Sequence, residues 1–448
     1  MKSPARLCLV IATAIVLLSA ASSHAQENDP PKFEIGAQHS SLSVNYPDVG
    51  GGTEYSVGFG GRFTFNLNRH VAFEAEGNFF PNEIGETVSA GGRAFQAQFG
   101  VKVGKRFKRF GLFAKARPGF VSFGGTEKLT QSFITESGFS VPDIVFGLER
   151  KTHLSLDVGG VLEFYPSRHV VTRFDIGDTI IRYRERNDFG TTDVIVPPGI
   201  SILPIVKDPP QTKHNFQFTA GVGYRFGGTD KGGTPAPHSS SGGTGVPRFE
   251  VGIQFTSLIF NPPPVVSGFA VITSGENPVN PEAGFGGRAT YNFNSHVAAE
   301  AEGNFFPRHS FPNGSSGGYP SQVQFGAKVG KRWRKVGVFA KARPGFVSFS
   351  QVTQLVGTHT ITFTTPINET FTIGDFAVKR KTYFSTDVGG VVELYPSRRI
   401  VTRFDVGDTV IHYGDRQVPG ELLSHNIIRI APETRHNLQV SAGIGWRF

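Results

Sequence analysis

An eleven-residue stretch that occurs twice constrains the fold of this chain more than any other feature. The sequence Phe-Ala-Lys-Ala-Arg-Pro-Gly-Phe-Val-Ser-Phe occupies Phe113–Phe123 and returns at Phe339–Phe349, 226 positions later. A match of this length does not arise by chance in 448 residues, so the sequence predicts a tandem duplication. In an extended strand, Lys115 and Arg117 fall on one face and the apolar residues beside them on the other. Each copy therefore contains a strand that separates a polar environment from an apolar one.

The N-terminus has the pattern of a secretory signal peptide. Lys2 and Arg6 precede the apolar run Leu7–Ala21, and small residues follow it. This order predicts that residues 1–25 are a signal peptide, removed on export. Cys8, the only cysteine, lies inside the apolar run. The predicted mature chain therefore contains no disulfide, thiolate nucleophile or cysteine-ligated metal.

Composition indicates an all-β protein. The chain has 56 Gly and 42 Phe but one Met, unlike a helical protein. The formal net charge is +9, to which Lys2 and Arg6 contribute two units. This small excess over a long chain predicts no nucleic-acid partner. No stretch after the signal peptide approaches 18 consecutive apolar residues, so no transmembrane helix is expected.

Each copy contains eight segments in which apolar and polar residues alternate. Most span about ten residues or more, as a tilted transmembrane strand requires, and exceed the usual strand of a soluble sheet. The predicted strands of the first copy run near Phe33–Ser43, Tyr55–Asn66, His70–Phe80, Ala94–Phe107, Phe110–Phe123, Thr152–Tyr165, Val170–Tyr183 and Asn215–Phe226. Those of the second run near Phe249–Leu258, Gly284–Phe293, Val297–Phe306, Gln322–Trp333, Val336–Phe349, Thr382–Tyr395, Ile400–Tyr413 and Asn437–Phe448.

The connections between these segments alternate in length. Short turns, such as Lys108–Arg109 and Pro166–His169, alternate with long polar loops, such as Gly124–Lys151 and its counterpart Gln351–Lys381. Short periplasmic turns and long extracellular loops are typical of outer-membrane β-barrels. We predict two tandem eight-stranded antiparallel transmembrane barrels, residues 26–227 and 248–448, joined by a Gly/Ser/Pro-rich linker at 228–247. The alternative is that all sixteen strands close into one barrel.

Glycine indicates which face of the strands lies inside. Gly100 and Gly104 share the polar face with Lys102, whereas the other face carries bulky residues such as Phe99. A narrow barrel interior needs small residues between large ones, and a solvent-exposed face does not. The polar face is therefore predicted to line the lumen, and a bulge is expected at Pro118. Aromatic residues near the short turns resemble an interfacial girdle: Phe65, Phe107, Phe110, Phe164, Tyr165, Trp333 and Tyr395.

The ends of the two copies carry a family resemblance. Gly-Val-Gly-Tyr-Arg-Phe closes the first copy at Gly221–Phe226, and Gly-Ile-Gly-Trp-Arg-Phe closes the second at Gly443–Phe448. The chain thus resembles, twice over, the eight-stranded outer-membrane barrels that include the OmpA transmembrane domain, OmpX and the opacity proteins. The resemblance implies a bacterial outer-membrane location, with outer-membrane lipid and the barrel-assembly machinery as partners. It also implies that Phe448 is the assembly signal, because the last strand of this family ends on an aromatic residue.

Five acidic and five basic residues of each copy are predicted to form a lumenal charge network. Buried ions require partners, so a balanced set is expected to plug the lumen. The resemblance would also allow a gated ion path through rearranging pairs. The residues of the first copy are Arg62, Glu74, Glu76, Lys102, Lys115, Arg117, Asp157, Glu163, Arg173 and Asp175. Those of the second are Arg288, Glu300, Glu302, Lys328, Lys341, Arg343, Asp387, Glu393, Arg403 and Asp405.

No motif predicts catalysis. The pairs Glu74/Glu76 and Glu300/Glu302 could suggest acid–base or metal chemistry, but they point toward arginines and lysines. The histidines lack metal-ligand spacing, and we find no nucleophile motif. We therefore expect no enzyme activity, cofactor or metal, and a structural or surface-interaction role with the long loops as contact surface. The alternatives are a porin-like channel for small solutes and a soluble periplasmic ligand-binding barrel.

Overall fold

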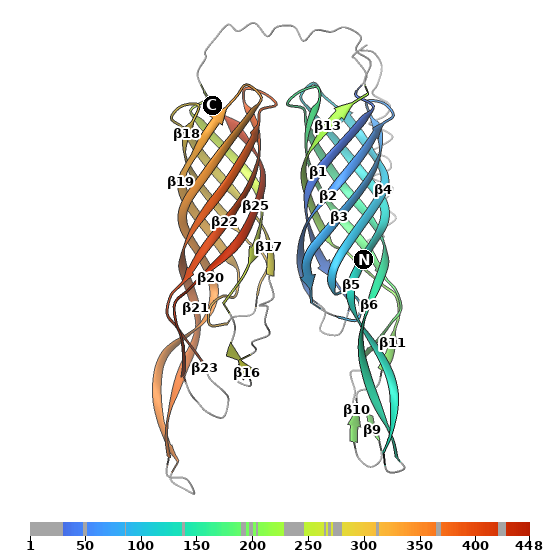
Figure 1. Cartoon of the computed structure of the whole chain (residues 1–448), viewed down its shortest axis with the longest axis vertical. Coiled ribbons are helices and arrows are strands. Elements are labelled where there is room, and N and C mark those ends of the chain that lie inside the picture. The colour runs from blue at the N-terminus through green and yellow to red at the C-terminus, as the bar shows by residue number, and fades with distance from the viewer. Residues whose placement is uncertain are drawn as a thin grey trace, which may run out of the picture. The chain divides into compact units, whose positions relative to one another are not determined.

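In the computed structural model, every regular element of the described residues is a β-strand (Figure 1). It describes residues 30–47, 52–85, 87–136, 139–189, 194–196, 200–202, 205–227, 246–263, 266–267, 270–271, 280–310, 313–363, 369–419 and 427–448. The predicted signal peptide lies outside these residues, as do residues 228–245 of the predicted linker. Among the described residues, no helix is long and apolar enough to span a bilayer.

The first copy closes into an antiparallel barrel of eight strands. The last strand, β13, pairs with β1 from Phe33↔Phe226 onward, and β6 pairs with β7 to complete the ring. The strands are β1 (Phe33–Asn45), β2 (Thr53–Asn66), β3 (Val71–Ile84), β4 (Gly92–Arg106), β5 (Phe110–Glu136), β6 (Phe139–Phe164), β7 (Val170–Tyr183) and β13 (Phe216–Phe226).

The second copy forms a closed barrel of its own. β25 pairs with β14, with Arg447 opposite Glu250, so the single sixteen-stranded barrel is excluded. The chain divides into two compact units, Met1–Gly242 and Gly243–Phe448. The strands are β14 (Phe249–Phe260), β17 (Asn280–Asn292), β18 (Val297–Phe305), β19 (Pro320–Arg332), β20 (Val336–Phe363), β21 (Glu369–Leu394), β22 (Ile400–Tyr413) and β25 (Glu433–Arg447).

The outer face of each barrel is apolar, because alternate residues of every strand point away from the lumen. Exposed outer residues include Phe59, Phe99 and Leu154 in the first barrel and Ile253 and Phe325 in the second. A soluble barrel would not expose so large an apolar surface, whereas a lipid-facing barrel requires it. The inner face carries the polar residues of the alternating pattern.

Two predicted long loops are instead continuations of strands. β5 and β6 keep pairing beyond the barrel, from Thr126↔Glu149 to Glu136↔Phe139, after a register shift that follows Phe123. β20 and β21 do the same from Val352↔Lys379 to Phe363↔Glu369. Figure 1 shows both hairpins extending well past the barrel bodies. The loop prediction was wrong because these segments lack the regular apolar–polar alternation of the barrel strands, although their threonines and β-branched residues favour strands.

Short strands at the same end decorate the remaining long connections. β8 pairs with β11, β9 with β10, and β12 extends the pairing of β7. In the second barrel, β15 pairs with β16 and β23 with β24. Their bounds are β8 (Arg186–Phe189), β9 (Val194–Val196), β10 (Ile200–Ile202), β11 (Ile205–Asp208), β12 (Gln211–Lys213), β15 (Val266–Ser267), β16 (Ala270–Val271), β23 (Arg416–Pro419) and β24 (Ile427–Ile430).

The bulge predicted at Pro118 does not form. The register of β4 with β5 is the same on both sides of Pro118, and on the other side Pro118 pairs with Leu156. Proline has no N–H to donate, and the ladder with β4 is interrupted beside it without a shift. The requirement for glycine at the next position is steric, since a Cβ on Gly119 would lie 2.1 Å from the carbonyl oxygen of Ala97. Only glycine permits this approach between strands.

Candidate functional site: the barrel lumen

The structure places all twenty predicted lumenal charges inside the two barrels. The ten of the first barrel are at most 4% exposed and the ten of the second at most 5%. They come from β2 through β7 and from the equivalent strands of the second copy. Strand alternation explains their common orientation, because residues two apart on one strand share a face.

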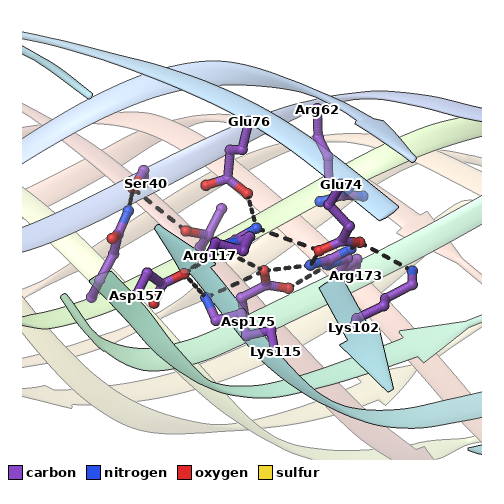
Figure 2. A network of polar contacts seen from close by, with 12 residues as sticks. Ser40, Arg62, Glu74, Glu76, Lys102, Lys115, Arg117, Asp157, Arg173 and Asp175 are labelled. Atoms are coloured by element: carbon purple, nitrogen blue, oxygen red, sulfur yellow. Dashed lines mark hydrogen bonds and ion pairs between the residues drawn. The ribbon is translucent and has the colours of Figure 1, made fainter. Parts of the chain in front are cut away.

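Arg117 is one centre of the first network. Its Nε donates a hydrogen bond to Asp157 Oδ2 at 2.9 Å, and its Nη1 donates to Glu76. Figure 2 shows Arg117 between these two carboxylates, which come from opposite strands β6 and β3. Lys115 also pairs with Asp157, with Nζ 2.9 Å from Oδ2. The planar guanidinium thus bridges two carboxylates, a geometry that favours arginine over lysine.

Arg173 is the second centre. Its Nη2 donates to Glu74 Oε2 at 2.9 Å and to Asp175 Oδ2 at 2.8 Å. Glu74 also pairs with Lys102, with Nζ 3.2 Å from Oε1, and Lys102 in turn pairs with Glu163. The two centres are joined, because Arg117 Nη1 lies 3.6 Å from Glu74 Oε2. Nine of the ten charges therefore belong to one continuous network.

Arg62 is the exception among the ten. Its Nη1 donates to the side-chain oxygen of Gln38 at 3.1 Å, and no carboxylate of the described residues forms an ion pair with it. The second barrel repeats this exception, since Arg288 donates to Gln254 at 3.3 Å. Within the predicted set of five acidic and five basic residues, the arginine at this position therefore forms no ion pair with the described residues in either copy.

The second barrel reproduces the rest of the network. Arg343 Nε donates to Asp387 Oδ2 at 3.0 Å, and its Nη1 donates to Glu302. Arg403 Nη2 donates to Glu300 Oε2 at 2.9 Å, the same distance as its counterpart in the first barrel. The repeated geometry indicates that the lumenal network was duplicated with the fold.

A further ionic cluster lies at the short-turn end of each lumen. In the first barrel Glu34 accepts hydrogen bonds from Arg225 Nε at 3.3 Å and from Asn66 Nδ2 at 3.0 Å. Arg106 lies 3.5 Å from the same carboxylate. The Tyr165 hydroxyl donates to Glu163 at 2.8 Å, so Tyr165 lies inside the barrel and not in the predicted aromatic girdle. Tyr395 makes the same contact with Glu393, and the girdle prediction was wrong for it as well.

Sequence reasoning missed the members of this cluster, although a signal was present. Glu34 shares the face of Gln38 on β1, Arg106 shares that of Lys102 on β4, and Arg225 shares that of Gly223 on β13. Arg106 lies in a basic segment beside a short turn, where side chains are more often solvated. The structure instead directs them inward, where their charges are paired.

Between the ionic network and the long-loop end, the lumen contains a layer of amide and hydroxyl groups. Gln38 Nε2 donates to Asn78 Oδ1 at 2.8 Å, and Asn78 Nδ2 donates to Gln96 Oε1 at 2.9 Å. Gln96 continues to Gln217 at 3.0 Å. These neutral groups satisfy one another across four strands, so the network continues toward the long-loop end without further charge.

An apolar cluster fills the long-loop end of each lumen. Leu42, Phe80, Val121, Phe123 and Ile181 are 0% exposed and pack together with Tyr183 in the first barrel. The second barrel has an equivalent cluster of Leu258, Phe306, Val347, Phe349, Ile411 and Tyr413. Val121 and Phe123 share the face of Lys115 and Arg117 on β5, so the inner face changes from ionic to apolar along one strand.

The chemistry available to the lumenal carboxylates is limited by their partners. Glu74 is held by Arg173 and Lys102, and Glu76 by Arg117, so neither is poised as a general base or metal ligand. Within the described ranges, no group of three or more His, Cys, Asp or Glu residues could hold a metal ion. The arrangement supports packing and electrostatic neutralisation.

A closed eight-stranded barrel with an apolar outer face and a lumen of paired charges is a transmembrane β-barrel. Residues 12–226 match the family model described as the outer membrane protein beta-barrel domain. The family model thus covers the first barrel, and the second barrel, which lies outside the matched residues, repeats the first strand by strand. Comparison with curated proteins gives no match.

Solved structures of outer-membrane barrels resemble parts or most of the chain. Neisserial surface protein A is 10% identical, covering 45% of this chain and 100% of its own, with a TM-score of 0.26. The N-terminal β-barrel domain of Pseudomonas aeruginosa OprF is 12% identical, covering 44% and 99%, with a TM-score of 0.24. A Pseudomonas aeruginosa FadL homologue is 10% identical, covering 93% and 90%, with a TM-score of 0.26.

Proposed function

We propose that each barrel is a sealed anchor in the bacterial outer membrane and that the protein acts at the cell surface through its long-loop end. The observation that carries this proposal is the apolar cluster across each lumen, whose central side chains are fully buried. Beneath it lies a continuous ionic network. Two successive barriers of different chemistry oppose the passage of solutes. The apolar cluster excludes ions, and the ionic network excludes large apolar molecules.

The hairpins at the long-loop end support a surface-interaction role. In the second barrel, β20 and β21 continue to pair beyond the membrane-spanning part and expose apolar side chains such as Val356 and Val378. Leu148 is similarly exposed on the hairpin of the first barrel. A protruding paired hairpin presents ordered side chains to a partner at little entropic cost. No catalytic role is proposed.

Export and assembly complete the proposal. Residues 1–25 direct export, and the assembly machinery reads Phe448, which follows β25. The exposure of Phe448, 67%, supports this role, because a receptor can reach the ring. Its amide N–H donates to the carbonyl of Phe249 at 2.8 Å, which aligns the last residue with the first strand of the barrel.

Conductance of the refolded protein in a planar bilayer tests the anchor proposal. Insertion is first verified by protection of the barrels from added protease. We expect little or only brief conductance, because both lumens are filled along their length. A large, stable, ohmic conductance from each inserted molecule would contradict the sealed-anchor proposal and favour the porin-like alternative. Recovery of the native protein in the soluble fraction without detergent would favour the periplasmic-binder alternative.

A further inference from the structure

The short-turn end of the first barrel carries exposed charge of one sign. Its exposed basic residues are Lys32, Lys105, Lys108, Arg109 and Arg168. Within the described residues, the only carboxylates at this end are Glu34 and Glu163, and both are buried inside the lumen. Among the described residues, the exposed charged side chains of this end are therefore all basic. We call these exposed residues, and their equivalents in the second barrel, the basic rim.

The second barrel has the same arrangement. The exposed residues of its basic rim are Arg248, Lys331, Arg334, Lys335, Arg398 and Arg399. Glu250 and Glu393 lie at this end of the barrel, but they are buried and paired with lumenal arginines. The same separation of inner anions from outer cations thus occurs twice in one molecule.

Comparison of the two copies shows that the rim retains charge while residue type changes. Lys108 corresponds to Arg334 and Arg109 to Lys335, so the order of the two cations is exchanged. At the other end of the barrel charge is not retained at every position, since Glu149 corresponds to Lys379. Lysine and arginine differ in hydrogen-bond geometry but share the positive charge. The rim is therefore suited to an anionic ligand that needs no fixed bidentate geometry.

Aromatic side chains place the rim at the membrane interface. Phe107 is exposed and stacks on Phe110 with ring centroids 4.5 Å apart, and Lys105 Nζ lies 5.5 Å from the centre of the Phe107 ring. In the second barrel Lys331 Nζ lies 5.6 Å from the Trp333 ring. Aromatic rings settle at the level of lipid headgroups, and long cationic side chains extend beyond them into water. The cations thus lie where headgroup phosphates are found.

We propose that the basic rim of each barrel binds the headgroups of anionic glycerophospholipids in the leaflet that it faces. Each rim brings five or six exposed cations to one interface, and a cation near an anionic membrane surface contributes about a fivefold gain in association. This binding is distinct from the proposed surface interaction, which lies at the opposite end of each barrel. It selects lipid by charge and would recruit phosphatidylglycerol-type lipid around the protein.

Tryptophan fluorescence offers a direct measurement at this rim. The chain has two tryptophans. Trp333 lies in the turn after β19, and Trp446 pairs with Ile400 at the start of β22, so both report on the short-turn end of the second barrel. The full chain is reconstituted in phosphatidylcholine bilayers that contain brominated phosphatidylglycerol or brominated phosphatidylcholine. Bromine quenches only nearby rings, so the ratio of quenching gives the relative association constant of the two lipids.

We expect phosphatidylglycerol to be preferred by at least about fivefold in 0.1 M NaCl. The preference should approach one in 1 M NaCl, where the Debye length falls from about 10 Å to about 3 Å. In the double variant Arg334→Gln/Lys335→Gln the preference should fall by at least about threefold. The matched control Lys379→Gln/Arg380→Gln removes the same charge from exposed residues at the long-loop end and should leave the preference unchanged.

Three results would overturn the proposal. Equal quenching by the two lipids in the parent protein would show that the rim does not select anionic headgroups. Equal loss of preference in both double variants would show that net charge acts without the rim. Displacement of the brominated lipid by lipopolysaccharide, but not by unbrominated phosphatidylglycerol, would assign the site to the other leaflet's lipid. Each variant is first checked for native insertion by protease protection.

Discussion

Replacing Arg343 by methionine would test whether the lumenal network behaves as a set of buried ion pairs. The Arg343 side chain is fully buried and hydrogen-bonds both Glu302 and Asp387. Methionine retains much of the side-chain length and removes the charge. Asp387 would keep Lys341 at 2.7 Å, whereas Glu302 would keep only the amide of Asn304 at 2.9 Å. The variant therefore leaves one buried carboxylate without an ionic partner among the described residues.

The expected loss follows from that single unpaired ion. Removing one partner of a buried ion pair costs about 3–5 kcal/mol, because the remaining charge keeps its desolvation penalty. Asn304 offsets part of this penalty, so we expect about 3–4 kcal/mol of lost unfolding free energy. With a urea dependence of about 2 kcal/mol per molar, the unfolding midpoint would fall by about 1.5–2 M.

The assay is urea unfolding from phospholipid bilayers followed by the fluorescence of Trp333 and Trp446. Both tryptophans lie in the second barrel, so the first-barrel variant Arg117→Met provides an internal control. That variant should leave the tryptophan transition unchanged. A midpoint shift below about 0.5 M for Arg343→Met, or an increase in stability, would refute the reasoning. It would mean that water solvates the lumenal charges and that the network does not seal the barrel.

Three further outcomes are expected. Arg288→Met should cost no more than about 1–2 kcal/mol in the same assay, because Arg288 forms a hydrogen bond but no ion pair with the described residues; a loss equal to that of Arg343→Met would contradict this. The hydrogen bond from Arg429 holds the pKa of Asp415 below its usual value, so the stabilising pair is present at neutral pH and is lost as pH falls through that pKa. In Arg429→Gln the carboxyl titration, followed by ¹³C NMR, should move up toward the ordinary aspartate value, and an unchanged midpoint would argue against the pair. Deleting Phe448 should lower the assembled fraction in cells, measured as heat-modifiable mobility in gels, and full assembly would show that the signal lies elsewhere.

Strand alternation made most of the barrel predictable. The first strand was predicted at Phe33–Ser43 and extends over Phe33–Asn45. It could be predicted because lipid and lumen impose opposite chemistry on successive residues. The signal disappears where the hairpins leave the membrane, since both faces are then wet. The sequence of Gly124–Lys151 was therefore interpreted as a loop, although this segment continues the paired strands β5 and β6. Only its content of strand-forming residues could have indicated this.

The lumenal site was predictable as a set of residues but not as a set of contacts. Parity placed Arg117 and Glu76 on the inner face, yet their pairing depends on the stagger of strands around the barrel. No local pattern reports that stagger. The apolar cluster was missed for a related reason, because Val121 and Phe123 occupy the same parity as Arg117 and nothing in the alternation marks the change.

The two copies also show which parts of the protein are constrained by packing. All ten lumenal charges recur, and the contact of Arg173 with Glu74 has the same length as its counterpart in the second barrel. At the long-loop end, the partly exposed Glu149 corresponds to the exposed Lys379. A lumenal position cannot change alone without leaving a buried ion unpaired, whereas an exposed loop position changes at little cost in stability. Under the proposed function, duplication therefore supplies two equivalent anchors that present two different contact surfaces.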